Sequence, residues 1–189
     1  PGQKPTVESF LLGATSCIYV STENIYLTTP GTNIHKITIE GGSITYVANG
    51  LVPGYVLNQF SMDEYRGFFR IATSDGSSNN VYILDEKLNV VGRLEDLAPG
   101  EDLHSARFMG NRCYLVTFKK VDPLFVIDLE NPESPQVLGR LKIPGYSDYL
   151  HPYDETHLIG VGKETVEGET NAWYQGVKIA FFDVTDMSN

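Results

Sequence analysis

Neighbouring carboxylates are the residues of this chain best suited to chemistry. The pairs Asp63-Glu64, Glu101-Asp102 and Asp154-Glu155 offer the acid and base that a glycoside hydrolase requires. That reaction needs two carboxyl groups from different strands facing each other across a pocket, whereas adjacent carboxylates in a turn are normally solvated. We therefore expect no catalytic residue and no cofactor, and we keep a carboxylate-dependent glycoside hydrolase or lyase as the alternative function.

Three aspartates end equivalent apolar segments, at Asp85, Asp128 and Asp183. A ring of carboxylates at such positions would line a channel or hold Ca²⁺, but a calcium loop needs several oxygen ligands at close spacing. The stretch from Asp183 to Asp186 offers only two carboxylates. We therefore predict that each aspartate caps a turn by accepting backbone N–H groups, and that the chain has no metal site.

The histidines and cysteines give no second metal signal. The four histidines, His35, His104, His151 and His157, form no ligand pair at a recognised spacing with cysteine or carboxylate. His157 falls in a column of strand residues that favours a place in the core. The two cysteines, Cys17 and Cys113, occupy different columns of the first and third repeats, and we predict two buried free thiols rather than a disulfide.

These columns come from an internal repeat that positions every candidate residue. Four segments rich in β-branched and aromatic residues align without gaps, and their central residues Leu27, Ile71, Leu115 and Ile159 stand 44 residues apart. The residues on both faces of this segment are apolar or small, which is typical of a strand that lies between two packed layers. A helical solenoid of similar period would need a 3.6-residue apolar pattern, which the chain lacks.

Each repeat contains four short strands separated by turn residues, which predicts an all-β fold, a β-propeller with about four four-stranded antiparallel blades. We expect a single propeller segment over residues 1–189. Its blades cover approximately 16–49, 57–94, 103–141 and 147–184.

The chain ends do not complete a fourth blade. The last blade stops before its outermost strand, and residues 1–15 are either a strand of a preceding blade or a strand that closes a four-bladed ring. We favour an arc of a larger propeller. The open edges and faces of an arc favour self-association.

One insertion interrupts the repeat, at residues 163–175, and it contains the only tryptophan. Trp173 and Tyr174 are adjacent, and an exposed aromatic pair can stack on a sugar ring or anchor a protein interface. The alternative is a hairpin whose aromatic side chains fold back onto the edge of the blade. We take Trp173 and Tyr174 as the candidate ligand-binding residues.

Charge and hydropathy exclude two classes of partner. The net charge of −10 and the absence of a Lys/Arg cluster larger than Lys119-Lys120 argue against a nucleic-acid partner, because phosphate binding needs a basic face. The sequence contains no apolar run of about 18 residues, so we expect no membrane span in this segment.

Four stretches of the chain carry a family resemblance: Leu57 to Tyr65 (LNQFSMDEY), Arg107 to Gly110 (RFMG), Val121 to Leu129 (VDPLFVIDL) and Tyr149 to Asp154 (YLHPYD). In combination they resemble the prokaryotic secreted proteins whose β-propeller domain is distantly related to WD40 repeats. The resemblance implies a propeller that is secreted or displayed at the cell surface, within proteins longer than this chain and of largely unassigned role. We expect a binding or scaffolding module that recognises a protein or a polysaccharide.

Overall fold

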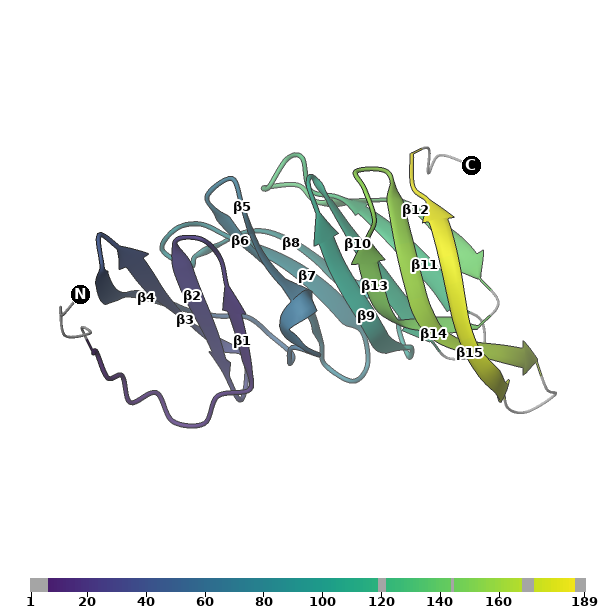
Figure 1. Ribbon diagram of the computed structural model, residues 1–189, viewed down its shortest axis with the longest axis horizontal. Helices are drawn as coiled ribbons and strands as arrows, with labels where there is room; N and C mark the ends of the chain where they lie inside the picture. Colours follow the sequence, from purple (N-terminus) through teal and green to yellow (C-terminus); the bar gives the residue numbers. More distant parts are fainter. Residues whose placement is uncertain (1–6, 119–121, 144, 168–171, 186–189) are drawn as a thin grey trace, which may run out of the picture.

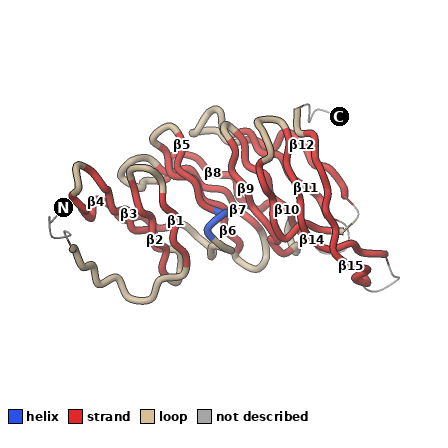
Figure 2. The backbone as a smooth tube through the Cα atoms, in the orientation of Figure 1, coloured by secondary structure: helices blue, strands red, loops and turns tan. Residues whose placement is uncertain are grey.

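The protein is an almost purely β structure in which four antiparallel sheets follow one another in a row (Figures 1 and 2). The computed structural model describes residues 7–118, 122–143, 145–167 and 172–185. Within this part of the chain, the only helical element is the single 3₁₀ turn η1 (Gln59–Ser61). No helix of the described residues is long and apolar enough to cross a membrane.

Each sheet is built from strands that are consecutive in the sequence and paired in sequence order. The first sheet contains β1 (Cys17–Val20), β2 (Asn24–Thr29), β3 (Asn33–Glu40) and β4 (Ser43–Leu51). The second contains β5 (Met62–Tyr65), β6 (Phe68–Ser74), β7 (Asn79–Leu84) and β8 (Val90–Leu97). The third contains β9 (Asp102–Met109), β10 (Arg112–Phe118), β11 (Asp122–Asp128) and β12 (Gln136–Ile143), and the fourth contains β13 (Tyr146–Pro152), β14 (His157–Glu167) and β15 (Ala172–Asp183). The predicted all-β architecture with blade-like sheets is confirmed.

The hydrophobic core consists of three layers, one between each pair of neighbouring sheets. Strand β6 shows how the sequence produces this arrangement, since successive side chains of a strand point to opposite faces. Phe69 and Ile71 pack against the first sheet, whereas Ala72 packs against the third. All five residues from Phe69 to Thr73 are buried, as expected for a strand covered on both sides.

The hairpin between β5 and β6 has a two-residue turn. Strand β5 continues to Tyr65, which pairs with Phe68, and only Arg66 and Gly67 form the turn. Both residues have positive φ angles, 52° and 81°. This is the two-residue hairpin whose backbone twist matches that of the flanking strands, and glycine at its second position relieves the strain.

The last repeat is one residue out of step with the others. The second strands of the four sheets begin at Asn24, Phe68, Arg112 and His157, so the steps are 44, 44 and 45 residues. Consequently Leu158, and not Ile159, packs against the third sheet. The prediction that His157 lies in the core is therefore wrong. Its ring stacks on Phe181 of β15, with centroids 4.9 Å apart, and it is only partly buried.

The four sheets form an open arc, with the chain termini at opposite ends (Figure 1). Residues 7–15 form no strand, and the Phe10 ring lies 6.3 Å from the Tyr46 ring of β4 in the first sheet. This segment does not supply the missing strand of the fourth sheet, so the closed four-bladed ring does not form. The outward face of the fourth sheet exposes Val177, Ile179 and Phe181.

Candidate functional site

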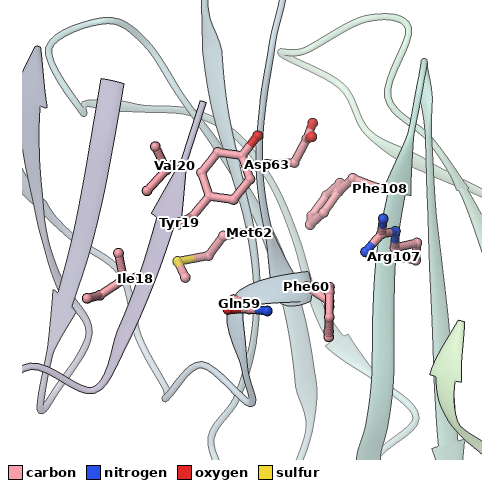
Figure 3. Close-up of a pocket in the computed structure, with 9 residues that line it drawn as sticks. All are labelled: Ile18, Tyr19, Val20, Gln59, Phe60, Met62, Asp63, Arg107 and Phe108. Atoms are coloured by element: carbon pink, nitrogen blue, oxygen red, sulfur yellow. The ribbon is translucent and has the colours of Figure 1, made fainter. Parts of the chain in front are cut away.

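A pocket of about 520 Å³ lies where the first strands of three sheets approach one another. Figure 3 shows side chains from β1, η1, β5 and β9 around one hollow. The described residues that line it are mostly apolar or aromatic: Ile18, Tyr19, Val20, Gln59, Phe60, Met62, Asp63, Arg107 and Phe108. We call this the inner pocket. Its volume is in the range of about 300–1,000 Å³ that is usual for ligand sites.

The turn η1 places two side chains at this pocket. Asn58 precedes the turn, and its side-chain oxygen accepts a hydrogen bond of 2.9 Å from the backbone N–H of Phe60. Such a cap holds a short turn that its own backbone bonds stabilise only weakly. As a result, the Phe60 ring contacts two neighbouring sheets. It lies 5.2 Å from the guanidinium carbon of Arg107 on β9 and 5.1 Å from the Tyr149 ring on β13.

The two charged side chains of the inner pocket have different surroundings. Asp63 forms an ion pair with Arg70, a β6 residue that is only 3% exposed. Arg70 also donates to the carbonyl of Gly110 at 2.6 Å. Arg107 is half-buried, and among the described residues its guanidinium forms no ion pair.

The carboxylate next to Asp63 in the chain is also engaged in structural bonds. Glu64 accepts a hydrogen bond from the hydroxyl of Ser21 and another of 2.8 Å from the Asn24 amide, both in the β1–β2 hairpin of the first sheet. The backbone N–H of Glu64 donates to the hydroxyl of Tyr19 at 3.2 Å. Burial is the main cause that raises the pKa of Tyr19. The pair Asp63-Glu64 therefore ties sheets together and does not face a second pair across the pocket.

The three strand-end aspartates cap turns, as predicted. Asp85 accepts hydrogen bonds from the backbone N–H groups of Lys87 and Asn89 at 2.9 and 2.8 Å. Asp128 accepts from Glu130 at 2.9 Å, and Asp183 accepts from Thr185 at the same distance. The pKa of Asp85 is lowered mainly by the hydrogen bond from the Asn89 side chain and then by that from the Asn89 backbone. The pKa of Asp183 is lowered in the same way by hydrogen bonds from Thr185.

Two further sequence predictions concern metal and thiol chemistry. Within the described part of the chain, no group of three or more histidine, cysteine, aspartate or glutamate side chains is arranged to hold a metal ion. Cys17 and Cys113 are both free, as predicted, although Cys17 is only half-buried.

The match to known families agrees with the arrangement of the sheets. Residues 2–189 match the family described as the beta propeller domain. The chain belongs to this β-propeller family. Each sheet is therefore a blade, and the inner pocket is formed by the first strands of blades one to three and the turn η1.

The propeller has two archaeal relatives of unassigned role. It is 47% identical over 165 residues to an uncharacterized protein of Methanocaldococcus jannaschii, a match that covers 84% of this chain and 25% of that protein. It is 45% identical over 159 residues to an uncharacterized protein of Archaeoglobus fulgidus, covering 82% and 24%. The chain thus spans about a quarter of the length of these relatives.

Two solved structures have a similar fold. The designed protein Ika4 superimposes with a TM-score of 0.63 at 15% identity, over 93% of this chain and 99% of that one. BamB from Moraxella catarrhalis superimposes with a TM-score of 0.57 at 10% identity, over 79% and 40%. At these identities the similarity concerns the fold alone.

The predicted ligand-binding residues belong to β15 of the fourth blade, whereas the inner pocket is lined by the first three blades and η1. The insertion continues the β14–β15 hairpin, where the backbone of Trp173 pairs with Val166 and that of Tyr174 pairs with Thr165. The side chains of Trp173 and Tyr174 lie outside the described residues, so their role in binding stays a prediction.

Sequence reasoning missed the inner pocket itself. Phe60 and Asp63 belong to the stretch from Leu57 to Tyr65, and Arg107 begins the stretch from Arg107 to Gly110. Both stretches carry the family resemblance, and this was the available signal. The meeting of these stretches depends on the packing of successive blades, which no spacing within one repeat reveals.

Proposed function

We propose that the propeller is a binding or scaffolding module of a secreted or cell-surface protein, and that it recognises a protein or polysaccharide through the inner pocket. The observation that carries this proposal is an open pocket whose wall is mainly apolar and aromatic, with Arg107 among its lining residues. Ile18 and Val20 are 51% and 57% exposed on its rim, and exposed apolar side chains gathered around a hollow are typical of binding sites.

The arrangement of carboxylates favours binding over the alternative of glycoside hydrolysis. Asp63 is the only carboxylate among the described lining residues, and its partner is the buried Arg70. A retaining or inverting hydrolase needs two carboxyl groups about 5 to 9.5 Å apart on either side of the scissile bond. Export is supported by the family resemblance of the four sequence stretches described above.

A combined glycan and peptide array tests the binding role. The fluorescently labelled chain is expected to retain specific ligands, and Phe60→Ala is expected to weaken that retention about tenfold or more, because it removes a central aromatic contact. Val90→Ala changes an exposed residue of the outer strand β8 and serves as the matched control. Release of reducing ends from retained glycans would replace the binding proposal with the hydrolase.

Two further measurements address location and the aromatic hairpin. Antibodies against the chain are expected to label intact cells of the source organism without permeabilisation, and labelling only after lysis would contradict export. On the same array, Trp173→Ala tests whether the β14–β15 hairpin is a second recognition site, separate from the inner pocket. Loss of some ligands in Trp173→Ala but not in Phe60→Ala would assign those ligands to the hairpin.

A further inference from the structure

We propose that the inner pocket binds an extended peptide through a carboxylate, which is held by Arg107 while an adjacent apolar side chain enters the hollow. The inference rests on the proposed binding function and names the ligand class. The surroundings of Arg107, the composition of the wall and the free edge of β1 support it.

The guanidinium of Arg107 is oriented by stacking and is available to bind an anion. Its guanidinium lies against the face of Phe60, with 5.2 Å between the guanidinium carbon and the ring centroid. Stacking on an aromatic face fixes the plane of an arginine and leaves its N–H edge free for a bidentate contact with a carboxylate. Among the described residues, no carboxylate lies within ion-pair distance of Arg107. Figure 3 shows the Arg107 side chain beside the Phe60 and Phe108 rings at the hollow.

Asp63, the second charged group of the pocket, does not repel an anionic ligand strongly, because Arg70 neutralises its charge. Asp63 accepts hydrogen bonds from Arg70, including one of 2.9 Å from Nε, and its charge is balanced within the second blade. The uncompensated charge among the described lining residues is therefore the positive charge of Arg107. A charge-assisted hydrogen bond in a half-buried site is stronger than one in open water.

The remainder of the wall fits a peptide better than a polysaccharide. Ile18, Val20 and Met62 are aliphatic, and among the described side chains of the wall only the two charged residues, the Tyr19 hydroxyl and the Gln59 amide can form hydrogen bonds. A sugar ring carries several hydroxyl groups that each need a partner when buried, and this wall would leave most of them unsatisfied. An apolar side chain next to a carboxylate meets no such penalty.

Strand β1 adds a means of holding an extended backbone. It lines the inner pocket and is the edge strand of its sheet, because it pairs only with β2. An edge strand presents unpaired N–H and C=O groups, which an extended peptide can satisfy. The rim residues Ile18 and Val20 project from this strand.

The net charge of −10 makes the specificity easy to test. A strongly acidic chain repels acidic peptides at long range, so retention of an acidic peptide would identify a local cation. The probes are immobilised heptapeptides with Asp or Glu between Leu, Val or Phe residues, their Asn and Gln counterparts, and versions with a free or amidated C-terminus. Oligogalacturonate and its methyl ester are included as acidic and neutral polysaccharides.

We expect acidic peptides to be retained about tenfold or more tightly than their amides, since a charge-assisted hydrogen bond supplies that much discrimination. Arg107→Gln is expected to abolish the preference, and Arg107→Lys to keep part of it because it retains the charge but loses the bidentate geometry. Arg93→Gln, an exposed residue on β8, is the matched control. The comparison of free and amidated termini distinguishes a C-terminal carboxylate from an acidic side chain.

Three outcomes would overturn the inference. One is equal retention of acidic peptides and their amides that Arg107→Gln does not change and Phe60→Ala abolishes. This result would show that the pocket binds peptides without recognising a carboxylate, and the proposed binding function would stand. Retention of oligogalacturonate that depends on Arg107 would assign the pocket to an acidic polysaccharide. Retention of no peptide would reject the peptide class, and the wider glycan and protein array decides separately whether the propeller binds at all.

Discussion

Arg70 on β6 donates a hydrogen bond of 2.9 Å from its Nε to an Asp63 oxygen on β5, and this bond connects the core to the inner pocket. The same guanidinium donates to the carbonyl of Gly110 in the third blade and lies 4.7 Å from the Tyr65 ring and 5.2 Å from the Phe108 ring. A buried cation is stable only when it is paired and hydrogen-bonded. Asp63 therefore has a structural role besides its place in the pocket.

Removal of the charge of Asp63 is expected to destabilise the propeller. Asp63→Asn leaves Arg70 buried without a counter-ion, at a cost of about 3 kcal/mol, the lower end of the range for buried pairs because Asp63 keeps some contact with water. Urea denaturation measures the loss. Arg93→Gln is the matched control, since its ion pair with Glu95 is exposed and contributes less than about 1 kcal/mol. Equal losses in the two variants would contradict the role assigned to Arg70.

The one-residue shift of the last blade has a direct test in two adjacent residues. Leu158 is fully buried against the third blade, whereas Ile159 points to the outward face of the arc and is only partly buried. Leu158→Ala is expected to lower the free energy of unfolding by about 2–5 kcal/mol, the usual cost of a cavity in a core. Ile159→Ala is expected to cost much less. The reverse order in thermal or urea unfolding would restore the uniform 44-residue register.

The sequence allowed the blade architecture to be predicted because each strand repeats a local pattern of apolar residues and turn residues. It did not allow the register of the last blade to be predicted. Both Leu158 and Ile159 are aliphatic, so the local pattern fits either register, and only the packing of the fourth blade on the third shows that Leu158 faces the core. A Cβ atom on Gly160 would lie 2.4 Å from the Ser147 hydroxyl oxygen and 2.6 Å from the Phe182 ring, so only glycine fits at this position of the strand.

The inner pocket was beyond sequence reasoning for a related reason. Phe60 and Arg107 are 47 positions apart and belong to different repeats, and only the packing of blades brings their side chains together. Turn chemistry is local, so the roles of Asp85, Asp128 and Asp183 could be predicted from each aspartate and the residues that follow it.

The two thiols are expected to differ sharply in reactivity. Burial raises the pKa of both, and Cys113 is fully buried while Cys17 is half-buried on an edge strand. Because the thiolate is the reactive form, Cys17 should react with a thiol reagent slowly, and faster as the pH rises. Cys113 should react only after unfolding. Titration in buffer and in denaturant should therefore find one and then two thiols, with the first absent in Cys17→Ser. Rapid labelling of Cys113 in the native chain would contradict its burial.

Stability at acid pH is expected to depend on the turn after β6. Asp75 accepts hydrogen bonds from the hydroxyl and the backbone N–H of Ser77 and from the N–H of Ser78, each at 2.8 Å. These bonds lower the pKa of Asp75 from 3.8 to about 2. A carboxyl whose pKa is lower in the folded state stabilises the fold fully above its unfolded pKa. That stabilisation is lost as the pH falls from about 4 through about 2.

Urea midpoints between pH 5 and pH 2 measure this loss in the wild-type chain and in Asp75→Asn. The variant is expected to lose less stability over this interval, because it has no proton to bind at this position. The remaining decrease in the variant is expected from Asp85, Asp154 and Asp183, whose pKa values are lowered by similar turn hydrogen bonds. An NMR titration of the Asp75 carboxyl should show a midpoint near 2. A midpoint near 3.8, with parallel stability curves for the two proteins, would show that these bonds do not favour the carboxylate.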